Sequence, residues 1–393
     1  MRIDATRLIE QLETLGNIGF EAEKGTSRPA YSQAFNQGRA YVQDLMTEAG
    51  LITSVDEVGN LVGVLGGKSG YKKISIGSHI DTVPWGGIYD GTLGVLAAIE
   101  VIRALKNEEY ENKHPIEIIA FNEEEGNVIG GTFGSKAFVG AKLEDAMRAK
   151  MAEHQITLQN YRNSKRRAED YHCYVELHIE QGGRLEKDKT DIGLVEGIVG
   201  IVRYKASVTG QANHAGSTPM DLRDDALTKT CEIIDDLMKT VVANSRTMVC
   251  TVGTLNVVPG VVNIIPGLTE FVIEMRDSQM ESMEEVIAGL RDRWESQGLE
   301  LEKIIDQPVT RCDKHLGQLL EDATESLGLS AQKIFSGAGH DLINMAMLTP
   351  SVLIFIPSKD GISHSIKEFS EKRDIANGTE VLLELVKKID EED

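Results

Sequence analysis

The sequence predicts an α/β catalytic domain into which a smaller, ferredoxin-like domain of β-α-β-β-α-β order is inserted. Strand-like apolar runs alternate with helical segments up to about residue 180, the order changes between about 202 and 305, and the α/β pattern then resumes. A chain of 393 residues that is 41% hydrophobic is long enough for two domains with a large core. We therefore expect a catalytic domain at 1–203 and 313–393, with a lid domain at 204–312.

The first part of the chain has the pattern of a mostly parallel sheet covered by helices. Helices are expected within 1–50, on either side of a polar stretch that contains several glycines. Residues 92–106 are apolar on most sides, which predicts a helix packed on a sheet. Residues 174–180 alternate between apolar and polar side chains, as a strand does. The expected strands are 60–65, 74–76, 116–121 and 174–180, and a charged helical excursion covers about 141–170.

The inserted lid and the return to the catalytic domain are predicted from the same periodicities. The expected lid elements are a strand at 202–210, a helix at 220–243, strands at 247–257 and 268–276, a helix at 280–298 and a strand at 299–305. After the lid we expect a helix at 315–327, a buried strand at 352–356 and a closing helix at 374–389. The lid therefore interrupts the catalytic domain, and the chain returns to complete the sheet.

Composition excludes several function classes. The formal net charge of -21, from 41 Lys+Arg against 62 Asp+Glu, argues against nucleic acid or an anionic membrane as a partner. No apolar run is long enough to span a membrane, and the N-terminal helix lacks the apolar core of a signal peptide. The four scattered cysteines form no CxxC pair, so neither a disulfide framework nor a thiolate zinc site is indicated. We expect a cytoplasmic protein.

Residues 77–91 are the stretch around which the function is organised. A strand-like run leads into His79, and Asp81, two residues later, shares a side with it in an extended backbone. A loop with Pro84 and two glycines then leads to Asp90, just before the apolar helix. An imidazole and two carboxylates around one loop are typical of a metal site. The alternative is a polar loop in which the aspartates only cap turns and the next helix.

Further candidate ligands follow other predicted strands. Because the carboxyl ends of parallel strands meet at one edge of a sheet, side chains that end different strands can converge there. Two imidazoles and a carboxylate can hold one metal, and a carboxylate with an imidazole can hold a second if Asp90 is shared. Of the adjacent pair Glu124 and Glu125, one can bind metal while the other takes a proton from water. The five candidate ligands are His79, Asp90, Glu125, His178 and His364.

Seven ordered motifs give the chain a specific resemblance to a known family. They cover 77–83, 90–91, 121–126, 176–182, 213–219, 336–341 and 361–365. Over essentially its whole length the chain resembles the amidase/hydantoinase/carbamoylase family of two-metal amidohydrolases, which includes N-carbamoyl-L-amino acid hydrolases, allantoate amidohydrolases and β-ureidopropionases. The resemblance implies an exopeptidase-like catalytic fold with a lid that dimerises. It also implies two divalent metal ions per subunit, zinc or manganese, cobalt or nickel.

The resemblance also implies a role for each residue of the metal centre. His79, Asp90 and His178 would hold one metal, and Asp90, Glu125 and His364 the other. Glu124 would be the general base and acid, and Asp81 the partner of His79. No ligand position is vacant, which counts against a binding protein without catalytic activity.

The family's substrate contacts are carried over to five positions. They are Gln181, Asn263, Arg276, Gly337 and Ala338. For Gln181 the alternative is a surface loop amide, and for Arg276 a surface salt bridge with Asp277 or Glu274. His214 is expected to reach across a homodimer into the partner's site. The alternatives for His214 are a substrate contact within its own subunit or no role.

These observations predict an enzyme that acts on a small-molecule carboxylate. The expected reaction is hydrolysis of the carbamoyl (ureido) C–N bond of an N-carbamoyl-L-amino acid or a close analogue. An allantoate amidohydrolase is the alternative within the family. A dipeptidase or aminoacylase of the related metallopeptidases is a further alternative, and His178 and the short loop from His79 to Asp90 count against it.

Overall fold

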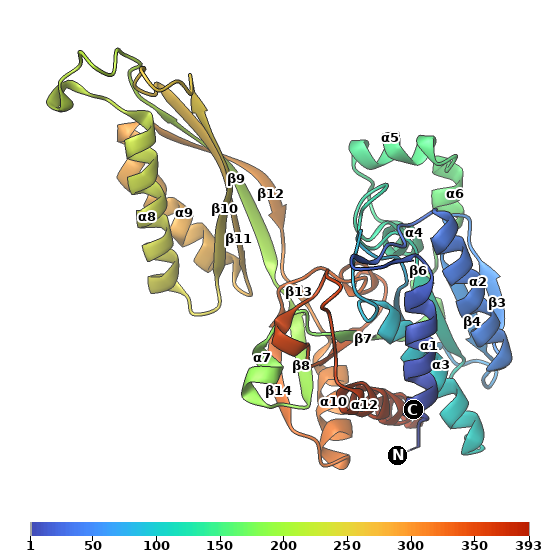
Figure 1. Ribbon diagram of the computed structural model, residues 1–393. Coiled ribbons are helices and arrows are strands. Elements are labelled where there is room, and N and C mark those ends of the chain that lie inside the picture. The colour runs from blue at the N-terminus through green and yellow to red at the C-terminus, as the bar shows by residue number, and fades with distance from the viewer. Residues whose placement is uncertain (1, 393) are drawn as a thin grey trace. The chain divides into compact units, whose positions relative to one another are not determined.

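The computed structural model of the protein describes residues 2–392 (Figure 1). Contacts divide the chain into two compact units, one formed by residues up to Glu196 together with those from Arg311 on, the other by Gly197–Thr310. The boundaries expected from the sequence, after residues 203 and 312, lie a few residues from these. Within residues 2–392, no helix has both the length and the apolar character needed to cross a bilayer.

The larger unit is built on a long mixed sheet. Its strands are β3 (Ile52–Val55), β4 (Leu61–Leu65), β5 (Lys73–His79), β6 (Ile116–Phe121), β7 (Tyr171–Ile179), β8 (Ile192–Ile198), β13 (Thr310–Arg311), β14 (Ala331–Ser336) and β15 (Ser351–Ile356). Two short strands, β1 (Phe20–Glu21) and β2 (Gly25–Thr26), form a separate hairpin. The helices are α1 (Ala5–Asn17), α2 (Gln33–Glu48), α3 (Thr92–Asn107), α4 (Phe133–Val139), α5 (Asp145–Glu153), α6 (Leu158–Asn163), α7 (Arg184–Asp188), α10 (Lys314–Ser326), α11 (Leu342–Met345) and α12 (Lys372–Glu391).

Four neighbouring strands of this sheet are parallel, and the outer strands are not. The order is β13-β8-β15-β7-β5-β6-β4-β3, with β14 paired to β8. Strands β15, β7, β5 and β6 run parallel, whereas β4 and β8 run antiparallel to their neighbours in this group. The carboxyl ends of the four parallel strands therefore share one edge, where open sheets of this kind bind ligands.

Burial on both faces of the sheet explains why its central strands read as nearly continuous apolar runs. Helix α3 is buried along almost its whole length and packs against α1, α12 and strand β5. Strand β7 directs Val175, Leu177 and Ile179 into this core. Glu176 and His178 alternate with these residues and are buried as well. The alternation read from the sequence thus separates the core from a buried polar site.

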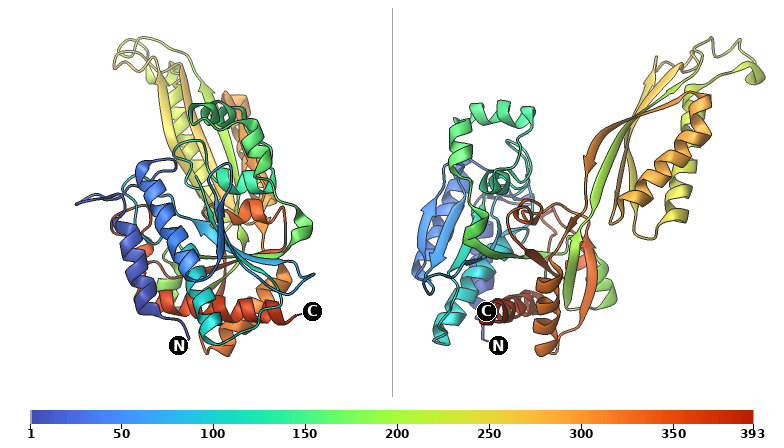
Figure 2. Two further views of the ribbon diagram at one scale, coloured as in Figure 1. Left: turned by 90° about the vertical axis from the view of Figure 1, so that its right-hand side faces the viewer. Right: turned by 180° about the vertical axis from the view of Figure 1, so that it is seen from behind.

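The smaller unit is an antiparallel sheet with two helices on one face (Figure 2). Its elements, in the β-α-β-β-α-β order expected from the sequence, are β9 (Gly200–Thr209), α8 (Ala226–Asn244), β10 (Val249–Val258), β11 (Leu268–Asp277), α9 (Met280–Trp294) and β12 (Leu299–Gln307). The strand order is β10-β11-β9-β12, and all three pairings are antiparallel. Phe271, Ile273 and Met275 alternate on β11 and are buried against the helices.

Candidate active site

The five candidate metal ligands come together at the carboxyl edge of the parallel strands, all within the larger unit. His79 is the last residue of β5, and His178 lies one residue before the end of β7. Asp90 precedes α3, Glu125 follows β6, and His364 follows β15. Their side chains form two groups, His79–Asp90–His178 and Asp90–Glu125–His364, in each of which the possible ligand atoms lie within 4.8 Å of one another. Asp90 belongs to both groups.

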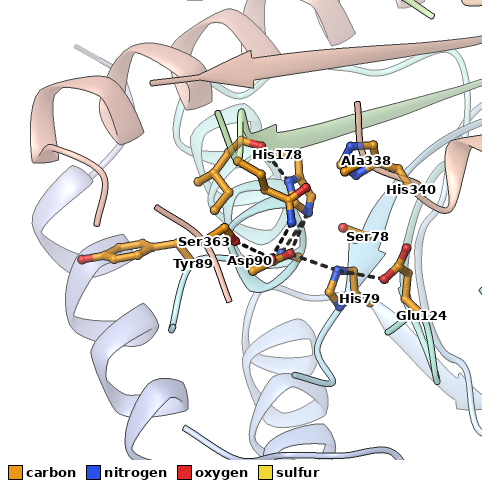
Figure 3. Close-up of polar contacts among 12 residues, drawn as sticks. Ser78, His79, Tyr89, Asp90, Glu124, His178, Ala338, His340 and Ser363 are labelled. Carbon is orange, nitrogen blue, oxygen red and sulfur yellow. Dashed lines mark hydrogen bonds and ion pairs between the residues drawn. The ribbon is translucent and has the colours of Figure 1, made fainter. Parts of the chain in front are cut away.

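The first group is built around one oxygen of Asp90 (Figure 3). The Nε2 atoms of His79 and His178 lie 3.4 and 3.1 Å from Oδ1 of Asp90. All three side chains are buried. Two features explain why glycine follows Asp90. Gly91 has a φ of +66°, and there is no room for a side chain, because an added Cβ would lie 2.4 Å from the His79 ring.

The hydrogen bonds of both imidazoles indicate which ring nitrogen is available to a metal. Nδ1 of His79 lies 3.0 Å from the carbonyl oxygen of Asp81, and Nδ1 of His178 lies 2.9 Å from that of Ile179. A carbonyl oxygen only accepts, so each Nδ1 carries the proton and each neutral ring presents the Nε2 lone pair. Two lone pairs that converge on a carboxylate oxygen need a cation between them. The donor atoms thus suit a divalent metal with nitrogen and oxygen ligands.

The second group uses the other oxygen of Asp90. Nε2 of His364 lies 3.2 Å from Oδ2 of Asp90 and 3.5 Å from Oε2 of Glu125. Burial raises the pKa of Glu125 to about 7, while the hydrogen bond with Asp90 raises the pKa of His364 to about 9. A divalent cation bound between these side chains would offset the negative charge of the two carboxylates.

Asp90 receives two further hydrogen bonds on Oδ2. Nε2 of Gln181 donates over 2.7 Å and Oγ of Ser363 over 2.9 Å. Burial by itself would raise the pKa of Asp90, but the three imidazoles beside its carboxylate hold that pKa well below its usual value. The structure thus places Gln181, expected to contact substrate, directly beside Asp90. Its Oε1 is buried and has no hydrogen-bond partner among the described residues.

Glu124 lies beside the first group without belonging to either group. One of its carboxylate oxygens is 3.7 Å from Nε2 of His79, and burial raises the pKa of Glu124 well above its ordinary value. Asp81 positions the Glu124–Glu125 pair, since its two carboxylate oxygens accept the backbone N–H groups of Glu124 and Glu125, each over 3.2 Å. Asp81 was expected to fix His79 with its side chain. Its carbonyl oxygen does so at 3.0 Å, while the carboxylate stands 3.7 Å away.

The loop of residues 336–341 contacts His178 through His340. Gly337 and Ala338 belong to it, and the backbone N–H of Ala338 donates to Oγ of Ser336. His340 stacks edge-on against His178, with ring centroids 4.5 Å apart. Burial lowers the pKa of His340 well below its usual value, so the ring is neutral. His340 belongs to neither candidate metal group.

The smaller unit carries the other three expected residues. Nδ1 of His214 accepts hydrogen bonds from the backbone N–H groups of Gly216 and Ser217, so Nε2 carries the proton of the neutral ring. The Asn263 carbonyl oxygen accepts from the Ala215 backbone, which brings the Asn263 and His214 loops together. Arg276 pairs with Glu274 through two nitrogens, 3.0 and 2.9 Å from one carboxylate oxygen. This is the salt bridge that was the alternative for Arg276.

Sequence reasoning missed two carboxylates that hold the loops of the site, Glu123 and Glu368. Oε1 of Glu123 accepts hydrogen bonds from three successive backbone N–H groups, those of residues 128–130, and so shapes the loop after Glu125. Glu368 accepts hydrogen bonds from the loop that carries Asp90. The position of Glu123 within the run of three glutamates was the available signal. For Glu368 the only signal was its closeness to the motif at 361–365.

Comparison with known proteins identifies the family. Residues 75–388 match the model described as Peptidase family M20/M25/M40. The chain belongs to this family. It is 37% identical to an N-carbamoyl-L-amino-acid amidohydrolase of Pseudomonas sp. (strain NS671) over 98% of both chains. It is 34% identical to an allantoate amidohydrolase of Escherichia coli over 95% of both chains.

Within the M20/M25/M40 family, the chain is similar to solved structures of a narrower group of amidases. An amidase of the hydantoinase/carbamoylase family from Burkholderia multivorans superimposes with a TM-score of 0.90 at 31% identity, covering 99% of this chain and 98% of that one. The resemblance stated from the motifs is therefore confirmed. The protein is an enzyme, an amidohydrolase of a metal-dependent hydrolase family, and the two donor groups around Asp90 are its candidate metal centre.

Proposed function

We propose that the protein hydrolyses the carbamoyl C–N bond of an N-carbamoyl-L-amino acid. The observation that carries the proposal is the pair of donor groups that share Asp90, with the separate carboxylate of Glu124 beside them. The amidohydrolase names of the relatives support the choice of a ureido substrate. Allantoate is the second candidate, because relatives named allantoate amidohydrolases match the chain over nearly its whole length.

Two divalent ions would be held by His79, Asp90 and His178 and by Asp90, Glu125 and His364. When bound, they supply Lewis-acid activation of water and of the ureido carbonyl. Glu124 then accepts the proton of the attacking water and returns it to the leaving nitrogen. Asp81 holds the backbone of Glu124 in place for both transfers. Zinc, manganese, cobalt and nickel all suit such a nitrogen and oxygen site.

Residues of the smaller unit would complete the site in a homodimer. The protonated Nε2 of His214 suits a donor to the oxyanion in the partner's site. Arg276 would clamp the substrate carboxylate after exchanging its pairing with Glu274, and Asn263 would be a second anchor. Gln181, Gly337 and Ala338 would contact the substrate from the larger unit.

The proposal also covers the partners of the protein and its cellular compartment. The partner would be a small carboxylate, with neither nucleic acid nor membrane, because the net charge of -21 repels anionic polymers and surfaces. All four cysteines are free, which fits a cytoplasmic, reducing compartment.

A substrate panel tests the proposal. Purified enzyme with added Mn²⁺ or Zn²⁺ is offered N-carbamoyl-L-amino acids, allantoate, N-acetyl amino acids and dipeptides, and kcat/KM is compared. We expect the N-carbamoyl compounds to be the best substrates. Preference for allantoate would select the second candidate, and preference for dipeptides or N-acetyl amino acids would refute a ureido hydrolase.

A further inference from the structure

We propose that Glu368 is a positioning residue for the shared ligand Asp90. It ties the loop that carries Asp90 to the loop that carries His364. The inference rests on the proposed metal centre and adds to it a residue that belongs to neither donor group. Glu368 is only 5% exposed, and its carboxylate lies between these two loops.

The first connection is to the backbone of the Asp90 loop. Oε1 of Glu368 accepts the N–H groups of Tyr89 and Asp90, over 2.9 and 3.1 Å. Two successive amides held by one oxygen fix the peptide plane from which the Asp90 side chain departs. The direction in which Asp90 presents its two oxygens is thereby set from outside the metal centre.

The second connection runs through Ser363. Its Oγ lies 2.9 Å from Oε2 of Glu368 and 2.9 Å from Oδ2 of Asp90. Ser363 directly precedes His364, whose φ of +54° marks a tight turn, and the Glu368 N–H donates to the Ser365 carbonyl. Glu368 therefore closes the short loop that carries His364 and connects this loop to Asp90.

Close packing at Gly87 shows that the loop is shaped around this carboxylate. A Cβ built on Gly87 would lie 2.2 Å from Oε1 of Glu368 and 2.5 Å from its Cβ. Any side chain at position 87 would thus displace the Glu368 carboxylate. Buried groups that orient metal ligands typically change metal affinity by about 10–100-fold when they are removed.

The test measures metal binding, not activity. Metal-stripped full-length protein is titrated with Mn²⁺ in a calorimeter, and Glu368→Ala is compared with Glu368→Gln. We expect Glu368→Ala to weaken binding by about 10–100-fold, chiefly for the ion at Asp90, Glu125 and His364. Glu368→Gln should stay within a few-fold of wild type, since its amide oxygen can accept both backbone N–H groups and its NH₂ group can donate to Ser363.

Asp390 supplies a matched control for the loss of a buried carboxylate. It is 1% exposed and accepts the backbone N–H groups of Lys113 and His114, together with the Tyr110 hydroxyl, away from the metal centre. Asp390→Ala should lower Tm while leaving the Mn²⁺ affinity unchanged. If Glu368→Ala does not fold, Gly87→Ala replaces it, because its methyl group displaces the same carboxylate while every hydrogen-bonding side chain is kept.

Each outcome has a distinct meaning. Wild-type Mn²⁺ affinity in Glu368→Ala or Gly87→Ala would overturn the inference. Equal weakening in Asp390→Ala, or no rescue by Glu368→Gln, would also overturn it, because the effect would then be general destabilisation. Wild-type protein that binds no divalent ion would instead refute the proposed metal centre itself.

Discussion

Replacing Glu124 by glutamine should separate proton transfer from metal binding. Glu124 stands outside both donor groups, and glutamine has nearly the same volume, so all five expected ligands remain. A general base contributes ~10²–10⁴-fold to rate, or ~3–5 kcal/mol in the activation barrier. We expect kcat to fall by this factor while bound metal is retained. Glu125→Gln removes a charged donor from the group of Asp90 and His364, and should lower metal occupancy.

The assay combines steady-state kinetics on an N-carbamoyl-L-amino acid with metal analysis of each variant after gel filtration. Wild type and Glu125→Gln, prepared in parallel, provide the comparison for metal content. If Glu124→Gln loses metal and Glu125→Gln keeps it, the two roles are exchanged. If Glu124→Gln retains the full rate, this carboxylate is not the base.

Four further results are expected. Exhaustive chelation should abolish activity and added divalent metal should restore it; a metal-stripped enzyme at full rate would contradict the metal centre. Arg276→Ala should raise KM for carboxylate substrates far more than Arg276→Lys, which keeps the charge but loses the planar fork. An unchanged KM in both variants would show that Arg276 does not bind the substrate. Mixed dimers of Glu124→Gln and His214→Ala should regain activity, because one of their two sites then has both an intact Glu124 and an intact His214 from the other subunit. Persistent inactivity after subunit exchange would show that His214 acts in its own subunit. Arg28→Met should lower the free energy of unfolding by ~3 kcal/mol or more. The reason is that the buried guanidinium donates hydrogen bonds to the carbonyls of Leu15, Ile18 and Ile80. An unchanged denaturation midpoint would contradict this expectation.

The sequence predicted the elements that are rich in apolar residues. Helix α3 and strand β6 were recognisable because most of their residues are apolar. Strand β8 was not predicted, since its glycines weaken the strand pattern and its pairing with β14 and β15 joins segments far apart in the chain. Where pairing depends on such distant partners, the local sequence contains little information about it.

The candidate site shows the same division. The strand-end positions of His79 and Glu125 could be read from the sequence, and the structure brings these residues to one edge of the sheet. The supporting hydrogen bonds could not be read in this way. Asp81 and Glu368 accept backbone N–H groups from loops distant in sequence, and any of the many acidic side chains could have done so.

Strand β15 lies between β7 and β8 in the sheet, although the chain makes the whole smaller unit before it reaches β15. On the ribosome, His178 therefore emerges long before His364, and at ~5–20 residues per second the delay is roughly 10–40 s. During that interval β7 has an unpaired edge and Asp90 has the imidazole partners of only one donor group. We expect the nascent chain to need protection from aggregation at this edge, and its full metal loading to follow translation.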